Sequence, residues 1–131
     1  MASLNQSFTK FDKDTFLIRF VISDTQVNLS SYYAWWGVST TVGSNPLIEK
    51  ATGGWTTGAS GTGLTMGSNY ADITMTQADF NGNGVTGKLD VGNYYHELVI
   101  AQSSNASDSV VVANGTFNVN ESLFTNEDYR W

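Results

Sequence analysis

The sequence of 131 residues contains no cysteine, a single proline and a single histidine. Without cysteine the chain has no disulfide, no thiolate metal site and no thiol nucleophile. Basic residues are also scarce, since six lysines and arginines stand against twelve acids and give a formal net charge of −6. Nucleic-acid binding depends on clustered positive charge, and these six residues are scattered. We therefore expect no nucleic-acid partner.

Long apolar runs are absent as well. No segment approaches the roughly 20 apolar residues of a membrane helix, and residues 1–7 lack the basic and apolar regions of a secretory signal. We therefore expect no membrane partner and synthesis in the cytoplasm. The hydrophobic share of 40% is enough for a packed core. We predict one domain over residues 1–131, with a core at 8–119, an N-terminal arm at 1–7 and an aromatic C-terminal tail at 120–131.

The clearest strand lies at residues 92–100 and follows a turn that begins at Asp90. Tyr94, His96 and Leu98 alternate with outward-facing residues such as Glu97, which is typical of a half-buried strand. In immunoglobulin-like sandwiches a tyrosine near the start of strand F sends its hydroxyl back to the backbone a few residues upstream. The pattern Asp-x-Gly-x-Tyr-x-Cys of that corner is matched here from Asp90 to His96, with histidine in place of cysteine. We predict that Tyr94 makes this contact.

Other segments show the same period of two. Residues 15–22 place their aromatic and aliphatic side chains inward, because the opposite register would bury Arg19. Residues 32–38 carry Trp36 as the core tryptophan of strand C, residues 46–50 suit an edge strand because proline is tolerated there, and a short strand is expected around Leu64. Residues 70–76 and 109–119 complete the pattern, the last with Val111, Ala113, Phe117 and Val119 on one face.

No helical periodicity appears. We predict an all-β fold, an immunoglobulin-like antiparallel β-sandwich of about seven to nine strands without a disulfide. The predicted core residues are Phe16, Ile18, Phe20, Trp36, Tyr94, His96, Leu98 and Phe117.

One loop matches the spacing of a calcium-binding loop. Asp79, Asn81, Asn83 and Asp90 stand at positions 1, 3, 5 and 12, with Gly84 at position 6. Against calcium, no amphipathic helix flanks the loop, and aspartate replaces the bidentate glutamate. A plain turn of Asn and Gly explains the same residues, so we favour the turn and predict no metal and no cofactor.

The sequence gives no positive sign of catalysis. His96 is predicted to point inward, without a nucleophile beside it, and Glu97 points the other way. We therefore interpret His96 as a core residue and predict that the protein is not an enzyme.

Large aromatic side chains are also predicted on the outside. Tyr33 and Trp35 should face outward, which indicates either a covered surface or a second small cluster, and Trp55 lies in a glycine-rich stretch. An edge strand near Ile48 could add to a partner's sheet. The predicted interface residues are Trp35, Trp55, Ile48, Lys50, Phe124, Tyr129, Arg130 and Trp131.

Between residues 8 and 119 the chain resembles the immunoglobulin-like N-terminal domain of phage baseplate upper proteins and related small virion proteins of tailed bacteriophages. The resemblance consists of several short motifs in a fixed order. They are Lys13-Asp14-Thr15 leading into the strand to Ile22, Leu29-Ser30, Pro46 with Ile48 and Lys50, Thr76 with Asp79, Gly92 with Tyr94, Glu97 and Leu98, and Gly115 with Phe117 and Val119.

The resemblance implies a structural virion protein without catalysis, made in the bacterial host and assembled in many symmetric copies with other virion proteins. The chain departs from the family in its glycine-rich insertion around Trp55, in its extended loop after Asp79 and in having no long C-terminal stalk. A tail or baseplate component and a capsid decoration are therefore both open. The alternative from another class is a carbohydrate-binding module for a host glycan, with Trp35, Trp55 and Tyr33 as a stacking platform.

Overall fold

The computed structural model describes residues 4–11, 15–22, 28–43, 46–52, 63–76, 90–102 and 109–121. These residues contain nine strands and no helix, which confirms the predicted all-β class. The strands are β1 (Leu4–Asn5), β2 (Phe8–Phe11), β3 (Phe16–Val21), β4 (Tyr33–Ser39), β5 (Ile48–Ala51), β6 (Leu64–Met66), β7 (Tyr70–Met75), β8 (Gly92–Ala101) and β9 (Val110–Asn120).

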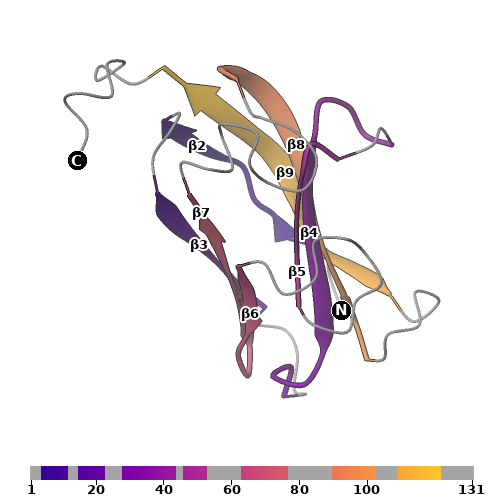
Figure 1. The fold of residues 1–131 in the computed structure, drawn as a ribbon. Coiled ribbons are helices and arrows are strands. Elements are labelled where there is room, and N and C mark those ends of the chain that lie inside the picture. The colour runs from indigo at the N-terminus through magenta and orange to yellow at the C-terminus, as the bar shows by residue number, and fades with distance from the viewer. Residues whose placement is uncertain are drawn as a thin grey trace.

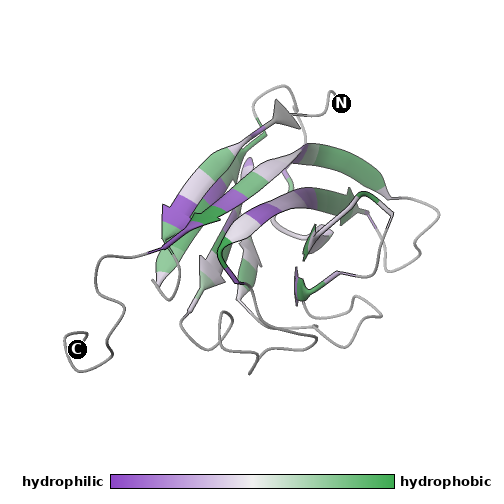
Figure 2. Ribbon diagram, turned by 90° about the horizontal axis from the view of Figure 1, so that it is seen from above, coloured by the Kyte–Doolittle hydropathy of each residue, from purple (hydrophilic) through white to green (hydrophobic). Residues whose placement is uncertain are grey.

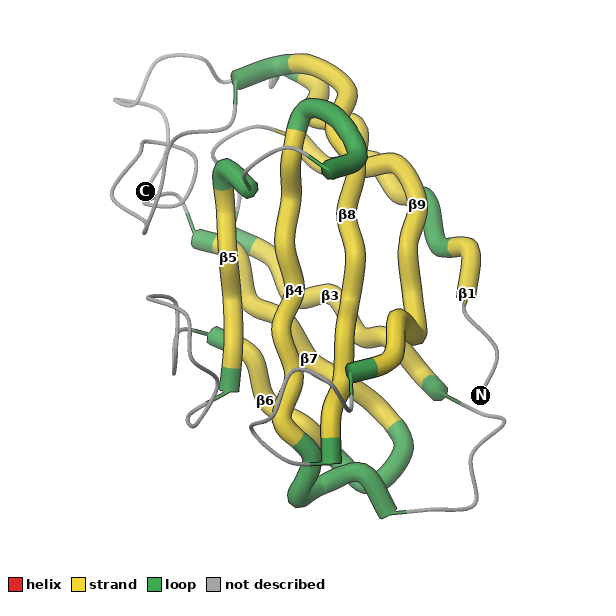
Figure 3. Tube along the Cα trace, turned by 90° about the vertical axis from the view of Figure 1, so that its right-hand side faces the viewer, coloured by secondary structure: helices red, strands yellow, loops and turns green. Residues whose placement is uncertain are grey.

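Two sheets pack face to face (Figure 1). The large sheet has the order β1-β9-β8-β4-β5, with β2 also paired to β9, and the small sheet has the order β3-β7-β6. Figure 3 looks onto the outer side of the large sheet, where β5, β4, β8 and β9 lie side by side. These orders correspond to strands C′-C-F-G and B-E-D of the immunoglobulin plan. The predicted β-sandwich is confirmed.

The core lies between the sheets and follows the predicted alternation. Phe20, Trp36, Leu98 and Phe117 are buried, and Phe16 and Ile18 pack against them while partly exposed. The hydropathy colours in Figure 2 alternate along several strands and become continuously hydrophobic at one end of the large sheet. Alternation therefore predicted which side chains form the core.

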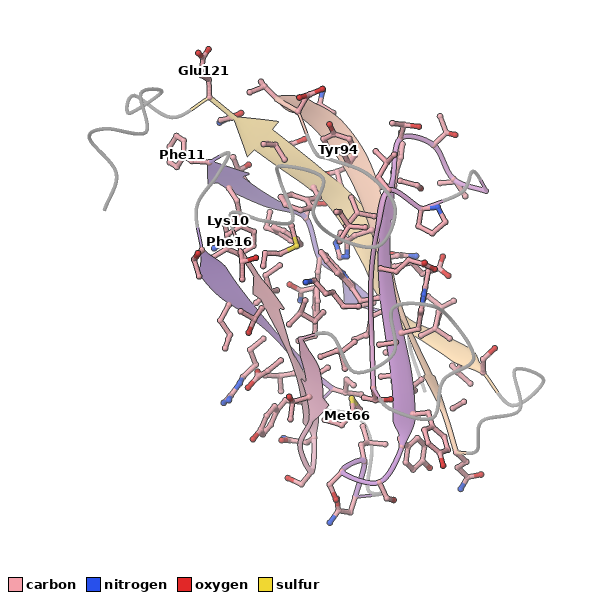
Figure 4. The ribbon with its side chains drawn as sticks, viewed as in Figure 1. Lys10, Phe11, Phe16, Met66, Tyr94 and Glu121 are labelled. Carbon is pink, nitrogen blue, oxygen red and sulfur yellow. The ribbon has the colours of Figure 1, made fainter. Side chains whose placement is uncertain are left out.

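The tyrosine corner is confirmed. The Tyr94 hydroxyl donates a hydrogen bond of 2.7 Å to the carbonyl oxygen of Asp90, and the ring lies between the sheets near the start of β8 (Figure 4). Burial raises the pKa of the Tyr94 hydroxyl, and the negative charge of Asp90 acts in the same direction. The hydroxyl therefore stays protonated as a donor and fixes the turn to the strand.

His96 is a core residue, as predicted. Its Nδ1 accepts a hydrogen bond of 3.3 Å from the indole Nε1 of Trp36, and its Nε2 contacts the carbonyl oxygen of Gln6. An indole nitrogen can only donate, so Nδ1 carries no proton and Nε2 donates to Gln6. The ring also stacks on Phe20, with centroids 5.5 Å apart. Burial lowers the pKa of His96, which keeps the imidazole neutral.

The N-terminal residues depart from the prediction of a polar arm at 1–7. Residues 4–5 form β1, and both β1 and β2 pair with β9 in parallel, whereas the other strand pairs are antiparallel. Phe8 explains why this segment docks, since its ring lies 4.7 Å from the ring of Phe117 and 4.9 Å from that of His96. The close approach also needs Gly115, because a β-carbon there would meet the carbonyl oxygen of Gln6 at 2.2 Å.

The predicted face of β9 is wrong at one position. Leu98 pairs with Ala113 but Val99 pairs with Val111, so a β-bulge shifts the register between them. Val112 is therefore buried and Val111 only partly so. A bulge adds one residue to one strand, and strict alternation cannot continue across it.

Candidate functional site

The outer face of the large sheet is organised in cross-strand rows. One row contains Ser39, Tyr95 and Thr116. The next row runs from Glu49 through Gly37 and Glu97 to Asn114, and a third runs from Ala51 through Trp35 and Val99 to Val111. Hydroxyl, carboxylate and amide groups thus occupy two neighbouring rows, and apolar side chains occupy the third.

A groove of about 730 Å³ lies over these rows, within the range of ordinary small-molecule sites. Its floor comes from β4, β8 and β9, and its rim includes Val42 and Pro46 from the connection between β4 and β5. Figure 3 shows the loop after β4 bending over β8 at this edge. Ser7, in the link between β1 and β2, also contributes to the lining.

Trp35 is the largest side chain among the residues that line the groove. Its indole Nε1 donates a hydrogen bond of 3.1 Å to Oε1 of Glu49 on the neighbouring strand. Its six-membered ring occupies the space over Gly37, where a β-carbon would lie only 2.2 Å from the ring. The glycine therefore lets the indole lie along β4, and the hydrogen bond to Glu49 fixes its orientation. The predicted outward orientation of Trp35 is confirmed.

Polar groups lie next to this ring. Glu97 pairs across the sheet with Gly37 on one side and with Asn114 on the other. Its carboxylate makes no hydrogen bond or ion pair with the residues that the structure describes. Tyr95, two residues before Glu97, lies on the same face of β8 and is 43% exposed. The sequence predicted that Glu97 faces outward but did not connect it with Trp35, because that connection depends on the pairing of β4 with β8.

Two predicted interface residues are not on the surface. Ile48 is 1% exposed and Lys50 is 7% exposed, because both occupy the inward face of β5 while Glu49 faces out. The same alternation in the sequence could have placed them. The prediction of an edge strand is confirmed, since β5 is the last strand of the large sheet.

The remaining predicted contact residues lie outside the described part of the chain. They are Trp55, Phe124, Tyr129, Arg130 and Trp131. The same holds for Asp79, Asn81 and Asn83 of the calcium-loop pattern, and the fourth member, Asp90, provides its carbonyl oxygen to Tyr94. Among the described residues no group of three or more acids and histidines could hold a metal ion.

A second exposed region was not predicted. Phe11, Leu17 and Val21 are each about half exposed, and they lie on β2 and β3. The ammonium of Lys10 lies 4.9 Å from the ring centre of Phe16, which joins these two strands, and Figure 4 shows Lys10 and Phe16 together beside Phe11. Here β3 is the last strand of the small sheet. We call Phe11, Leu17 and Val21 the β2–β3 patch.

Within this patch, between Leu17 and Val21 on the exposed face of β3, the small sheet satisfies its own charges. Arg19 donates two hydrogen bonds to the Asp72 carboxylate, of 2.7 Å and 2.8 Å, and its guanidinium lies 3.9 Å from the ring centre of Tyr70. The hydrogen bonds from Arg19 lower the pKa of Asp72. This bidentate pair leaves little unsatisfied polar capacity on that face.

No protein-family model matches the chain, and the comparison with curated proteins finds no match. No helix long and apolar enough to cross a membrane occurs in the described residues.

Proposed function

We propose that the chain is a non-enzymatic structural protein of a tailed-bacteriophage virion, either a tail or baseplate component or a capsid decoration. It is made in the cytoplasm of the bacterial host and assembles in many symmetric copies with other virion proteins. The observation that carries this proposal is the tyrosine corner between Asp90 and Tyr94, which stands in the same immunoglobulin-like frame as the phage domains that the sequence resembles.

The motif residues have structural roles in that frame, and this supports the proposal. Gly92 and Tyr94 form the corner, Leu29 is fully buried beside the core, and Phe117 and Val119 pack between the sheets. Gly115 permits the close approach of residue Gln6. These residues stabilise the fold, so proteins with the same type of domain would keep them in the same order along the chain. The order that this chain shares with the phage domains therefore supports a common domain type.

The polar groups support binding in preference to catalysis. His96 is buried, and both its ring nitrogens are occupied by Trp36 and Gln6. A general base needs an accessible nitrogen close to substrate, so this imidazole is unsuited to proton transfer with a ligand. It lies on the face of β8 opposite to Glu97, and the two cannot act together.

The β2–β3 patch supports assembly through protein contacts. Leu17 and Val21 are about half exposed on the outer face of β3, on either side of Arg19, and Phe11 is half exposed on β2 of the other sheet. Exposed apolar side chains of this size are typical of a surface that a partner covers. The β3 strand also ends its sheet, and an edge strand can pair with a strand of another chain. We assign this patch to the contact with another virion protein.

Mass spectrometry of purified particles tests the proposal. The protein should be found in particles at a constant copy number per virion and should resist removal by high-salt washing. A phage carrying the double substitution Leu17→Glu and Val21→Glu should lose the protein from its particles, while Leu17→Ala should retain it. Wild-type protein that is present in the lysate but absent from particles would overturn the virion role.

The second candidate is a carbohydrate-binding module for a host-surface glycan. The specific observation that favours it is the position of Trp35 in a groove beside a carboxylate, an amide and hydroxyl groups. Planar aromatic side chains combined with a few polar groups are typical of small-ligand sites. A glycan array probed with the wild-type protein and with Trp35→Ala tests this candidate, and loss of signal in the variant is the expected result.

A further inference from the structure

We infer that the groove on the outer face of the large sheet selects uncharged sugars, which place an apolar ring face against Trp35 and neighbouring hydroxyl groups on the carboxylate of Glu97. The inference rests on the second proposed function, glycan binding, and adds to it the class of sugar and the residues that select it. It does not depend on whether the protein belongs to a virion.

The first step is the shape of the apolar surface. The Trp35 ring is held over Gly37, and its indole nitrogen is fixed by Glu49 at 3.1 Å. A fixed aromatic ring binds with little loss of side-chain freedom, which favours affinity. A pyranose has one face of C–H groups that suits such a ring, with its hydroxyl groups around the rim.

The second step is the free carboxylate. Glu97 is partly buried, lies in the row next to Trp35 and has no partner among the residues that the structure describes. A carboxylate only accepts hydrogen bonds, and its two oxygens can accept from two neighbouring donors. Two adjacent sugar hydroxyl groups provide such a pair. Asn114 beside it and Thr116 in the next row can both donate and accept. Ser39 donates its hydroxyl proton to the carbonyl oxygen of Thr41 at 2.8 Å and can still accept a hydrogen bond.

The third step is the charge around the groove. The described lining includes Glu97 and contains no lysine or arginine, and Glu49 lies in the same row. The whole chain has a formal net charge of −6. An anionic sugar would therefore bring a second negative charge next to Glu97 without a cation to offset it, which is unfavourable at short distance. Uronic acids and sulfated or phosphorylated sugars are thus excluded, whereas neutral hexoses and N-acetylhexosamines fit.

A glycan array and calorimetry on the intact chain test the inference. The array should contain neutral hexose oligosaccharides, N-acetylhexosamine oligosaccharides and uronic-acid oligosaccharides of equal length. We expect binding of neutral members and none of the uronic acids. In calorimetry with the best neutral member, Glu97→Gln should weaken binding about tenfold, since the variant keeps the shape of the side chain but loses the charged acceptor. It should also reduce the discrimination against uronic acids.

Gly37→Ala gives a sharper test of the apolar surface. The added methyl group would meet the Trp35 ring at 2.2 Å, so the ring must move while the backbone of β4 can stay in place. Binding should fall at least tenfold, with circular dichroism and thermal unfolding close to those of the wild type. The matched control is Tyr33→Ala, which removes an aromatic ring from the same face of the same strand but outside the groove. That variant should bind as the wild type does.

The outcomes separate the two claims. If no sugar binds at millimolar concentration, the glycan-binding function itself fails. If uronic acids bind as well as neutral sugars, the groove does not select uncharged sugars and this inference is wrong. If folded Glu97→Gln and Gly37→Ala proteins bind normally, the protein binds glycans at another place and this inference is also wrong.

Discussion

The two faces of β8 use their polar groups in different ways. On the inner face, Tyr94 bonds to Asp90 and His96 bonds to Trp36 and Gln6, so each polar group is satisfied within the chain. On the outer face, the Glu97 carboxylate has no partner in the described part of the structure. A buried polar group needs a hydrogen-bond partner within the protein for the fold to be stable, whereas water can hydrogen-bond a partly exposed one and be replaced by a ligand. In the proposed glycan-binding role, alternate residues of β8 thus serve the fold on one face and the groove on the other.

The largest expected effect on stability comes from Gly115→Ala. The new β-carbon would lie 2.2 Å from the Gln6 carbonyl oxygen, and the residue has a φ of 154°. The backbone of the N-terminal segment must then shift, and the contact between Gln6 and His96 is lost. We expect a loss of roughly 2–4 kcal/mol in the free energy of unfolding, measured by denaturant titration.

Gly43→Ala is the control for that substitution. Gly43 also has a positive φ, of 87°, but a β-carbon there would have no neighbour within 4 Å. Its expected cost is the backbone strain alone, about 1 kcal/mol. Equal losses in the two variants would show that the close approach of Gln6 to Gly115 does not matter.

The pH dependence of stability provides a second test of the inner face. Burial lowers the pKa of His96 in the folded protein below the value of about 6.5 that is usual for histidine, so the unfolded chain binds the proton more readily. The stability that comes from the neutral imidazole is therefore fully present above pH 6.5 and falls as the pH drops below it.

The measurement is chemical unfolding of untagged protein between pH 7.5 and about 5.5, a window in which histidine is the side chain expected to titrate. The chain has a single histidine, and so His96→Gln should flatten the profile, though at lower overall stability. A wild-type profile with no slope in this window would contradict the neutral, buried imidazole.

Tyr94→Phe should have a smaller effect. It removes the 2.7 Å hydrogen bond to Asp90 but keeps the ring in the core. Because Asp90 is exposed, water can satisfy its carbonyl oxygen, and the loss should be about 1 kcal/mol. Thermal unfolding measures it, with Tyr95→Phe on the outer face as the matched control. An equally large loss in the control would remove the special role of the corner.

The smallest effect on stability is expected from Glu97→Gln. The carboxylate makes no contact within the described residues that the amide would break, so the free energy of unfolding should change by less than about 0.5 kcal/mol. Denaturant titration beside the binding assay checks this value. A marked destabilisation would mean that Glu97 serves the fold, and the division between the two faces of β8 would no longer hold.

Most of the sandwich could be predicted from the period of two. Alternation placed Trp36, Phe20 and Leu98 inside, and Arg19 fixed the register of β3, because burying its charge would be costly. The corner pattern identified the contact of Tyr94. These features depend on residues close together in the sequence, which is why the sequence alone was sufficient.

The features that escaped prediction depend on pairing between distant segments. The bulge opposite Leu98 and Val99 changes which valine of β9 is buried, and nothing local marks it. The parallel docking of residues 4–11 depends on the fit of Phe8 against His96 and Phe117. The groove likewise needs Trp35 and Glu97 on neighbouring strands, although Gly37, two residues after a surface tryptophan, was a usable signal for it.

The parallel pairing of β1 and β2 with β9 has a consequence for the order in which the domain forms. Ser7 and Thr116, which are joined by a hydrogen bond, stand 109 positions apart. Among the described strands, β1 and β2 therefore have no partner until β9 has been synthesised. Closing such long loops is slow, and until then the unpaired edge of an early strand is open to a neighbouring nascent chain. Residues 4–11 should accordingly be the last described segment to dock, once β9 has paired with β8 and Phe8 can pack against His96 and Phe117.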